Sequence, residues 1–293
     1  MFLGAIEAGG TKFVCAVSTL DLEVVERVSF STRTPEETMA DVFAFFDQYE
    51  LQAIGIGSFG PIDVNPKSDT YGFVLNTPKP GWAGYDFLGA LKGRYGVPAA
   101  WTTDVNAAAL GELGLGAAKG LESCLYLTVG TGIGGGAVVK GELLEGFGHP
   151  EMGHILVKRH PNDEFKGFCP FHGDCLEGLA AGPAIEGRVG KKAFELAKDD
   201  PAWEIEAYYL AQALMNYILI ISPERIILGG GVMKQEQLFG LVKKQLVKLL
   251  AGYVDLPDLE GFIVPPLLGD DAGITGALLL AAKCCTRKLL VQS

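Results

Sequence analysis

The stretch "GAIEAGGTKFVCAV", residues 4–17, decides the fold class because it places two glycines between two apolar, β-type runs. This pattern is typical of a β-hairpin with a tight turn at Gly9 and Gly10. "CLYLTVGTGIGGGAVVKGELLEG", residues 124–146, repeats the layout with a longer glycine turn. Two glycine-turned hairpins, one opening each half of the chain, indicate a duplicated unit.

The segments around the hairpins alternate between strand and helix patterns. "LQAIGIGSFGPID", residues 51–63, predicts a strand that ends in a loop. "PAAW", residues 98–101, predicts a short strand, followed by a polar turn at 102–104 and an alanine-rich helix. Residues 206–233 combine an apolar helix, a Ser-Pro break and a buried strand that runs into three glycines. Together they predict an α/β protein with mixed sheets.

Composition restricts the class of protein. A chain of 293 residues that is 48% hydrophobic and 20% charged can bury a sizeable core. No apolar run approaches the roughly 18 to 20 residues that cross a bilayer, and the first residues lack signal-peptide features. We therefore expect a cytoplasmic protein without a membrane partner, in which the cysteines stay reduced. The net charge of −11 argues against a nucleic acid partner.

The glycines suggest a phosphate ligand. Forty of the 293 residues are glycine, about twice the usual share, and they cluster in turns. Backbone amides without a neighbouring Cβ can converge on phosphate oxygens. Thr11 and Lys12 stand beside the first turn and Thr131 stands in the second. The turns are candidate phosphate sites, with two ordinary hairpins as the alternative.

One stretch, residues 149–178, holds all four histidines and two cysteines. Two imidazoles and two thiols form an S₂N₂ set that favours tetrahedral zinc, and a site filled by four protein ligands is structural. A reduced loop without metal is the alternative. Glu151 and Glu177 flank the set, and fixing the loop would direct both carboxylates toward ligand hydroxyls. The predicted zinc ligands are His154, Cys169, His172 and Cys175.

Five motifs in fixed order carry a resemblance to a known family: "EAGGTK", "TDVNAAALGE", "LTVGTGIGGG", "HPEMGH" and "CLEGLAAGPA". They resemble the ROK family of sugar kinases and regulators, in particular its bacterial fructokinase branch, from Gly4 to about Ala282. The resemblance implies an actin-like ATPase (ribonuclease H-like) fold with two domains around a cleft, ATP and Mg²⁺ as cofactors, and a homodimer. We expect a small N-terminal α/β domain at 1–118, joined by the C-terminal helix 271–293. A large α/β domain at 119–270 would carry the zinc loop.

The resemblance also assigns nucleotide-binding positions. The two glycine turns become phosphate loops, and "GGGVM" at 229–233 lies near the adenosine. The implied cofactor-binding residues are Gly9, Gly10, Thr11, Lys12, Gly130, Thr131, Gly132, Gly134, Gly182, Pro183, Gly229, Gly230, Gly231 and Met233.

The catalytic base of the family falls on Asp104, for which a helix N-cap is the alternative role. Thr103 stands where the family commonly has a sugar-binding Asn. Glu7 replaces the Asp of many relatives and is the candidate magnesium-facing acid, or else a carboxylate paired with Lys12. The implied sugar pocket comprises Gly60, Pro61, Asn76, Thr103, Asp104, Glu151, His154 and Glu177, although "NTPKP" at 76–80 also fits a rigid turn.

These expectations combine into one predicted activity. We expect an ATP-dependent kinase that phosphorylates the C6 hydroxyl of a hexose, with fructose as the first candidate and mannose as the second. A glucokinase or an N-acetylhexosamine kinase of the same family stays open. So does a sugar-binding ATPase that is not a kinase, because a fold alone does not dictate function.

Overall fold

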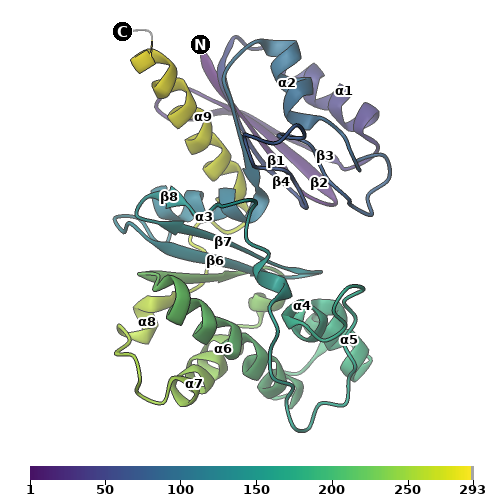
Figure 1. Ribbon diagram of the computed structural model, residues 1–293, viewed down its shortest axis with the longest axis vertical. Helices are drawn as coiled ribbons and strands as arrows, with labels where there is room; N and C mark the ends of the chain where they lie inside the picture. Colours follow the sequence, from purple (N-terminus) through teal and green to yellow (C-terminus); the bar gives the residue numbers. More distant parts are fainter. Residues whose placement is uncertain (292–293) are drawn as a thin grey trace. The chain divides into compact units, whose positions relative to one another are not determined.

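The computed structural model describes the backbone of residues 1–291 and the side chains of residues 1–286; residues 292–293 of the predicted closing helix lie outside. It divides into two compact units (Figure 1). Unit 1 contains residues 1–120, 143–149 and those from Asp270 on, and unit 2 contains 121–142 and 150–269. Within the described residues, no helix is long and apolar enough to cross a membrane.

Unit 1 is built on a five-stranded mixed sheet in the order β3-β2-β1-β4-β5. β1 pairs antiparallel with β2, and parallel with β4, so the hairpin predicted at residues 4–17 is confirmed with Gly9 and Gly10 in its turn. The strands are β1 (Phe2–Ala8), β2 (Lys12–Ser18), β3 (Val24–Ser31), β4 (Leu51–Ser58) and β5 (Ala99–Thr103).

Helices cover both faces of this sheet. Alternate strand residues point to opposite faces: Ile6 and Ile56 join the core under α1 (Pro35–Phe46) and α2 (Phe87–Tyr95). Leu3 and Ala5 join the core under α9 (Ala272–Val291). In Figure 1, α9 lies along the face of the sheet opposite α1 and α2.

Glycines bring α9 into backbone contact with its neighbours, β4 and α3 (Asp104–Gly114). A Cβ at Gly55 of β4 would lie 1.8 Å from the carbonyl oxygen of Ala277. A Cβ at Gly276 would lie 1.7 Å from the carbonyl oxygen of Ala107. No side chain fits at such distances, so glycine is required for α9 to pack this closely on α3 and β4.

Unit 2 repeats the topology of unit 1. Its sheet has the order β10-β9-β6-β7-β8, in which β6 pairs antiparallel with β7 and parallel with β9. Each sheet therefore combines a glycine-turned hairpin on one side with two parallel strands on the other, which confirms the predicted duplication. The strands are β6 (Cys124–Val129), β7 (Ile133–Val139), β8 (Glu142–Leu143), β9 (Arg225–Gly229) and β10 (Ile263–Val264).

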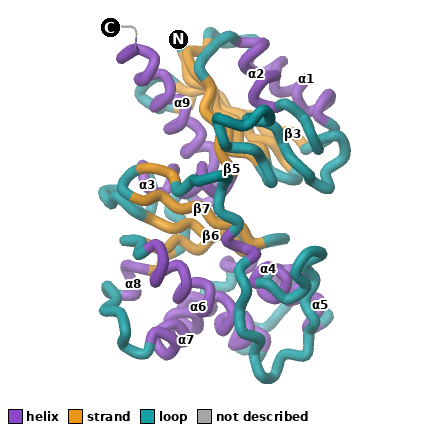
Figure 2. Tube along the Cα trace, viewed as in Figure 1, coloured by secondary structure: helices purple, strands orange, loops and turns teal. Residues whose placement is uncertain are grey.

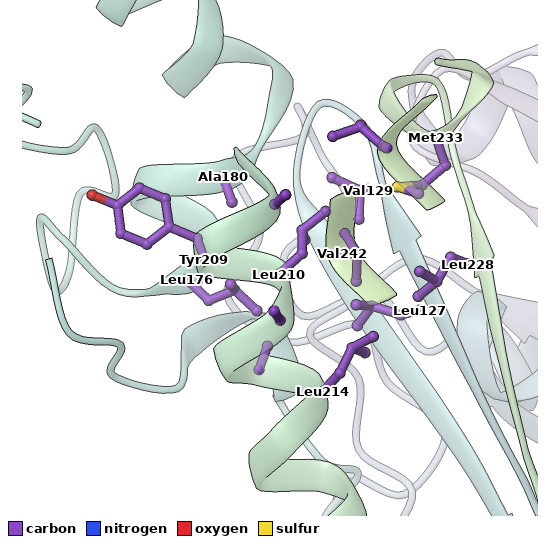
Figure 3. Packing of buried hydrophobic residues seen from close by; sticks show 14 of the residues in the cluster. Leu127, Val129, Leu176, Ala180, Tyr209, Leu210, Leu214, Leu228, Met233 and Val242 are labelled. Carbon is purple, nitrogen blue, oxygen red and sulfur yellow. The ribbon is translucent and has the colours of Figure 1, made fainter. Parts of the chain in front are cut away.

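Two long helices, α6 (Ala202–Ile221) and α7 (Gln237–Leu250), form the core of unit 2 with this sheet. Leu210 and Leu214 of α6 point toward the strand residues Leu127 and Val129 (Figure 3). Short helices complete the unit: η1 (Met152–His154), α4 (Leu176–Ala180), α5 (Gly182–Val189), η2 (Ala193–Glu195), η3 (Val232–Lys234) and α8 (Leu259–Phe262), with η4 (Gly269–Asp271) leading into α9. The stretch between β8 and α4 is mostly loop (Figure 2).

One predicted boundary is wrong. The polar turn expected at 102–104 is absent, because β5 continues through Thr103 and Asp104 is the first residue of α3. Thr102 and Thr103 are β-branched residues that suit an extended strand. They pair in parallel with Gly57 and Ser58 of β4.

Candidate active site

The first glycine turn presents backbone N–H groups. The N–H of Gly9 closes the turn on the carbonyl of Lys12 at 2.9 Å. The carbonyls of Gly9 and Gly10 accept from the Thr32 hydroxyl at 2.8 Å and the Lys79 ammonium at 2.6 Å. Within the described residues, the N–H groups of Gly10 and Thr11 donate no hydrogen bond. A turn with occupied carbonyls and available N–H groups can bind an anion.

Glu7 is the penultimate residue of β1, one position before Ala8, and lies in an acidic environment. Burial raises the pKa of Glu7 to about 7; the negative charges of Asp104 and Asp270 act in the same direction, and Lys12 opposes them. The Oε2 atom of Glu7 is buried and has no hydrogen-bond partner. Carboxylate oxygens are the ligands that Mg²⁺ prefers, and a cation would stabilise the ionised acids. The residues of this part of the site therefore fit a magnesium ion.

Asp104 starts α3, and it is not the N-cap. The cap is Thr103, whose side-chain oxygen accepts from the N–H of Asn106 at 3.1 Å. The alternative role for Asp104 is therefore wrong, because the strand runs one residue further than expected and Thr103 takes the capping position. The Oδ1 atom of Asp104 accepts from the N–H of Val105 at 2.9 Å. A helix N-terminus favours the ionised form of such a carboxylate.

The other predicted sugar residues of unit 1 lie in loops. Gly60 and Pro61 follow β4, and the ring of His149 lies 3.7 Å from the position of a Cβ on Gly60. The Nε2 atom of His149 accepts from the N–H of Ile62 at 3.4 Å. Asn76 is exposed, in the loop that leads to α2. Thr103 is buried, with its hydroxyl oxygen engaged in the helix cap.

The second glycine turn is tied to two helices. Its Gly130 carbonyl accepts from the N–H of Gly182, the first residue of α5, at 2.7 Å, and Pro183 follows. The N–H of Ile133 donates to the Oε2 atom of Glu177 in α4 at 2.9 Å. The turn itself contains Gly130, Thr131 and Gly132, and Gly134 lies in β7.

The segment after β9 also reaches this turn. Gly229 ends the strand, and Gly230 has a φ of +91°, a conformation that favours glycine. The N atom of Gly231 lies 3.9 Å from the position of a Cβ on Gly130. Met233, predicted near the adenosine, packs its side chain into the hydrophobic core of unit 2.

Four predicted metal ligands meet in unit 2. One ligand atom from each residue lies within 4.8 Å of all the others. The Nδ1 atom of His154 lies 3.7 Å from the Cys169 sulfur and 3.6 Å from the Cys175 sulfur, and the Nδ1 atom of His172 lies 3.8 Å from the Cys169 sulfur. Zinc bonds of about 2.3 Å to sulfur and about 2.0 Å to nitrogen place neighbouring tetrahedral ligands roughly 3.5 Å apart. The donor set therefore fits a zinc ion.

The same histidine faces a carboxylate with its other nitrogen. The Nε2 atom of His154 lies 3.9 Å from the Oε1 atom of Glu177. The carbonyl of Glu151 accepts from the N–H of His154 at 3.1 Å, so Glu151 begins the turn that carries this histidine. A metal on Nδ1 would fix the ring and hold Nε2 toward Glu177.

Two polar residues near the predicted positions were not predicted. Lys79 contacts Gly10, and Asp270 acts on the pKa of Glu7. Lys79 belongs to the stretch 76–80, for which the sequence indicated a sugar contact at Asn76 or else a rigid turn, and Asp270 precedes the last helix. No local pattern connects either residue with residues 7–10, so only the folded chain could reveal them.

The architecture and the site define a class of protein. Two mixed sheets of the same topology, each with a glycine-turned hairpin, form an α/β protein of the actin-like ATPase fold. The chain belongs to the ROK family, whose family model matches residues 3–284. The family and the fold class predicted from the motifs are thus confirmed.

Three similar proteins illustrate this relationship. The chain is 56% identical to a putative fructokinase of Bacillus subtilis, with 95% of both chains covered. It is 50% identical to a fructokinase of Pediococcus pentosaceus, with 96% of this chain and 98% of that protein covered. Among solved structures it resembles the ROK hexokinase of Thermus thermophilus, with a TM-score of 0.81, 29% identity, and 100% and 99% of the two chains covered.

Proposed function

We propose that this protein is an ATP-dependent fructokinase that transfers the γ-phosphoryl group of ATP to the C6 hydroxyl of fructose. The observation that carries the proposal is Asp104, a carboxylate at the start of α3 in the unit that also holds the first glycine turn. The similarity to fructokinases over nearly the whole chain supports the choice of sugar. Mannose is the second sugar proposed.

Asp104 acts as the general base. A sugar hydroxyl becomes an adequate nucleophile when a carboxylate accepts its proton as the phosphoryl group moves. The Val105 N–H fixes the orientation of this carboxylate from one side. Removal of the carboxylate should therefore reduce turnover far more than sugar binding.

The glycine turns hold the phosphates of ATP. In unit 1, the N–H groups at Gly10 and Thr11, with the side chain of Lys12, are the proposed donors. In unit 2, the turn around Thr131, the start of α5 at Gly182 and Pro183, and the segment Gly229–Met233 bind the nucleotide. Glu7 is the proposed acid that faces magnesium, and Mg²⁺ would neutralise charge on the phosphate oxygens.

The zinc cluster orders the residues that bind the sugar. Zinc would be held by His154, Cys169, His172 and Cys175 and would supply structural stability, because all four positions are filled by protein. Glu151, His154 and Glu177 then offer two carboxylates and one ring nitrogen to the hydroxyls of the sugar. Asn76, Thr103, Gly60 and Pro61 are the remaining proposed contacts, and Thr103 keeps a hydroxyl hydrogen to donate although its oxygen caps α3.

Domains and assembly belong to the same proposal. We propose that residues 1–118 with the last helix, and residues 119–270, are the two domains of the kinase. The segment 143–149 groups with the first of the two compact units. A homodimer is the proposed assembly, and light scattering of the purified protein measures it directly.

The test is ADP formation from ATP and Mg²⁺ with fructose, mannose, glucose or N-acetylglucosamine, each against a control without sugar. We expect turnover to depend on fructose, and fructose 6-phosphate to be the product by NMR. Dependence on glucose or N-acetylglucosamine alone would assign a different kinase of this family. ATP hydrolysis that no sugar changes would contradict the kinase proposal and favour a sugar-binding ATPase.

A further inference from the structure

Lys79 lies against the first glycine turn although it is 69 positions further along the chain than Gly10. Its Nζ atom donates to the Gly10 carbonyl at 2.6 Å and lies 5.5 Å from the centre of the Phe59 ring. A Cβ on Gly10 would lie 2.7 Å from both Nζ and Cε of this lysine. The side chain therefore fills the space that the glycine leaves open.

The backbone that carries Lys79 is held firmly. Its carbonyl accepts from the N–H of Trp82 at 3.2 Å, across Pro80 and a Gly81 with a φ of +78°. Proline followed by glycine at positive φ is typical of a type II turn. The Trp82 side chain is fully buried, and its Nε1 donates to the Arg33 carbonyl at 2.7 Å. The turn thus fixes the backbone from which the Lys79 side chain reaches Gly10.

The hydrogen bond to Gly10 does not by itself require a charge. A neutral amide could donate to a backbone carbonyl equally well, and an ammonium has two further donors. The two further donors of the Lys79 ammonium lie beside the glycine turn, where, in the part of the chain that the structure describes, the N–H groups of Gly10 and Thr11 donate no hydrogen bond. A preorganised cation beside an anion-binding turn is suited to stabilise charge on a phosphoryl group.

The surrounding charges strengthen this reading. The chain carries a net charge of −11. Glu7 and Asp104 add negative charge near the same turn, and the positive charge of Lys12 acts on Glu7. A triphosphate in this environment needs local cations, since long-range attraction is absent. Lys79 brings a second lysine to the turn from outside the glycine motif.

We propose that Lys79 is a catalytic residue whose ammonium donates to the phosphoryl group during its transfer. The bond between the γ-phosphorus and the ADP oxygen breaks, a bond from the sugar oxygen to that phosphorus forms, and the hydroxyl proton goes to Asp104. Lys79 keeps its protons throughout and offsets charge on the phosphoryl oxygens. This inference rests on the proposed kinase function and adds a residue to it.

The test compares Lys79→Gln, Lys79→Met and Lys79→Arg with the matched control Lys67→Gln, an exposed lysine of the same unit. Glutamine can still donate to the Gly10 carbonyl but has no charge. We expect Lys79→Gln and Lys79→Met to lower kcat about 100-fold or more, with the KM for fructose within about two-fold of wild type. Lys79→Arg should recover part of kcat, and Lys67→Gln should match wild type. A Lys79→Gln enzyme with wild-type kcat would overturn the proposal and make the lysine a structural tie.

A binding measurement separates this proposal from the kinase proposal. If the wild type phosphorylates no sugar, the kinase function fails, and Lys79 is then tested by calorimetry with ADP plus beryllium fluoride. We expect Lys79→Gln to bind this complex more weakly than wild type, with unchanged affinity for ADP and unchanged Tm. That result would support contact between Lys79 and the phosphoryl group, which beryllium fluoride mimics. Equal affinity of wild type and Lys79→Gln for the complex overturns it.

Discussion

The two glycine turns have the same place in two sheets of the same topology, yet different groups support them. In the first turn, side chains hold the carbonyls: Thr32 binds Gly9 and Lys79 binds Gly10. In the second turn, the N–H of Gly182 holds the carbonyl of Gly130, and the carboxylate of Glu177 accepts from Ile133. The two turns therefore share a backbone topology but differ in the groups that hydrogen-bond to them.

The difference teaches how the proposed function divides between the units. The first turn follows Glu7, whose pKa responds to the proposed base Asp104, so changes there should affect the chemical step. The second turn is hydrogen-bonded to Glu177, a proposed sugar ligand beside the proposed zinc site, so changes there should affect sugar binding and stability. Kinetic constants can test this division. Loss of an interaction made only in the transition state lowers kcat, whereas loss of substrate binding raises KM.

The largest expected effect is on the chemical step. Asp104→Asn should lower kcat about 1,000-fold, because general base catalysis contributes 10²–10⁴-fold, while calorimetry should find fructose affinity nearly unchanged. Asp69→Asn, an exposed acid of the same unit, is the control and should match wild type. Near-normal turnover of Asp104→Asn would show that Asp104 is not the base. It would also contradict the assignment of the chemical step to the first unit.

The second expected effect is on the stability of unit 2. Metal analysis of the purified protein should find one zinc per chain, and Cys175→Ser should lose it. We expect a loss on the order of 3 kcal/mol, or roughly 6–12 °C in Tm for a unit of this size, together with a higher KM for fructose. Cys285→Ser, a cysteine outside the cluster, is the control. A fully active protein with less than 0.1 zinc per chain would show that the cluster needs no metal.

A pair of glycine substitutions compares the turns directly. A Cβ at Gly132 would lie 2.7 Å from the Oε2 atom of Glu177, whereas one at Gly10 would displace the flexible end of Lys79. We expect Gly132→Ala to raise the KM for fructose about 10-fold and Gly10→Ala to lower kcat about 10-fold, which is about 1.4 kcal/mol in each case. The opposite assignment of the two effects would mean that the division between the turns is wrong.

The smallest expected effect concerns a buried acid far from either turn in sequence. Burial raises the pKa of Glu206 well above its ordinary value; Arg188 opposes this and Asp163 adds to it. The folded protein therefore holds a proton that the unfolded chain releases above about pH 4.3. Stability from this group is present at low pH and is lost as the pH rises, by about 1.4 kcal/mol per pH unit between the pKa of the unfolded chain and the raised pKa of the folded protein. Urea unfolding of Glu206→Gln should lack this slope.

The control for this prediction is activity. Glu206 is fully buried and both of its carboxyl oxygens lack a hydrogen-bond partner, so it has no proposed contact with substrate. The kcat of Glu206→Gln should equal that of wild type at pH 7. An unfolding free energy with the same pH slope in both proteins would show that Glu206 is ionised in the folded state.

The sequence predicted those features that depend on short-range patterns. Both hairpins follow from glycines between apolar runs, and the duplication follows from meeting that pattern twice. The cluster at His154, Cys169, His172 and Cys175 was identified because metal ligands are few in kind and spaced in recognisable ways. The sugar specificity has no such signature.

Features that depend on a single residue or on distant contacts were beyond the sequence. Thr103 and Asp104 are both good N-caps, so the sequence pattern could not decide between them. Pairing with β4 extends β5 to Thr103, which therefore becomes the N-cap of α3. The contact of Lys79 with Gly10 requires the turn at Pro80–Gly81 to be placed in three dimensions. The grouping of segment 143–149 with the first unit has the same origin.

The close packing of α9 has a consequence for how the protein is made. The helix that begins with the proposed base, α3, presents Ala107 to a glycine of α9, and β4 presents Gly55 to Ala277. During synthesis, α3 and β4 leave the ribosome long before α9 does. Until α9 emerges, α3 and β4 expose the surface on which this helix packs in the folded protein. Phosphoryl transfer should therefore begin only once α9 has been made and has packed, whatever the earlier parts of the chain have already folded.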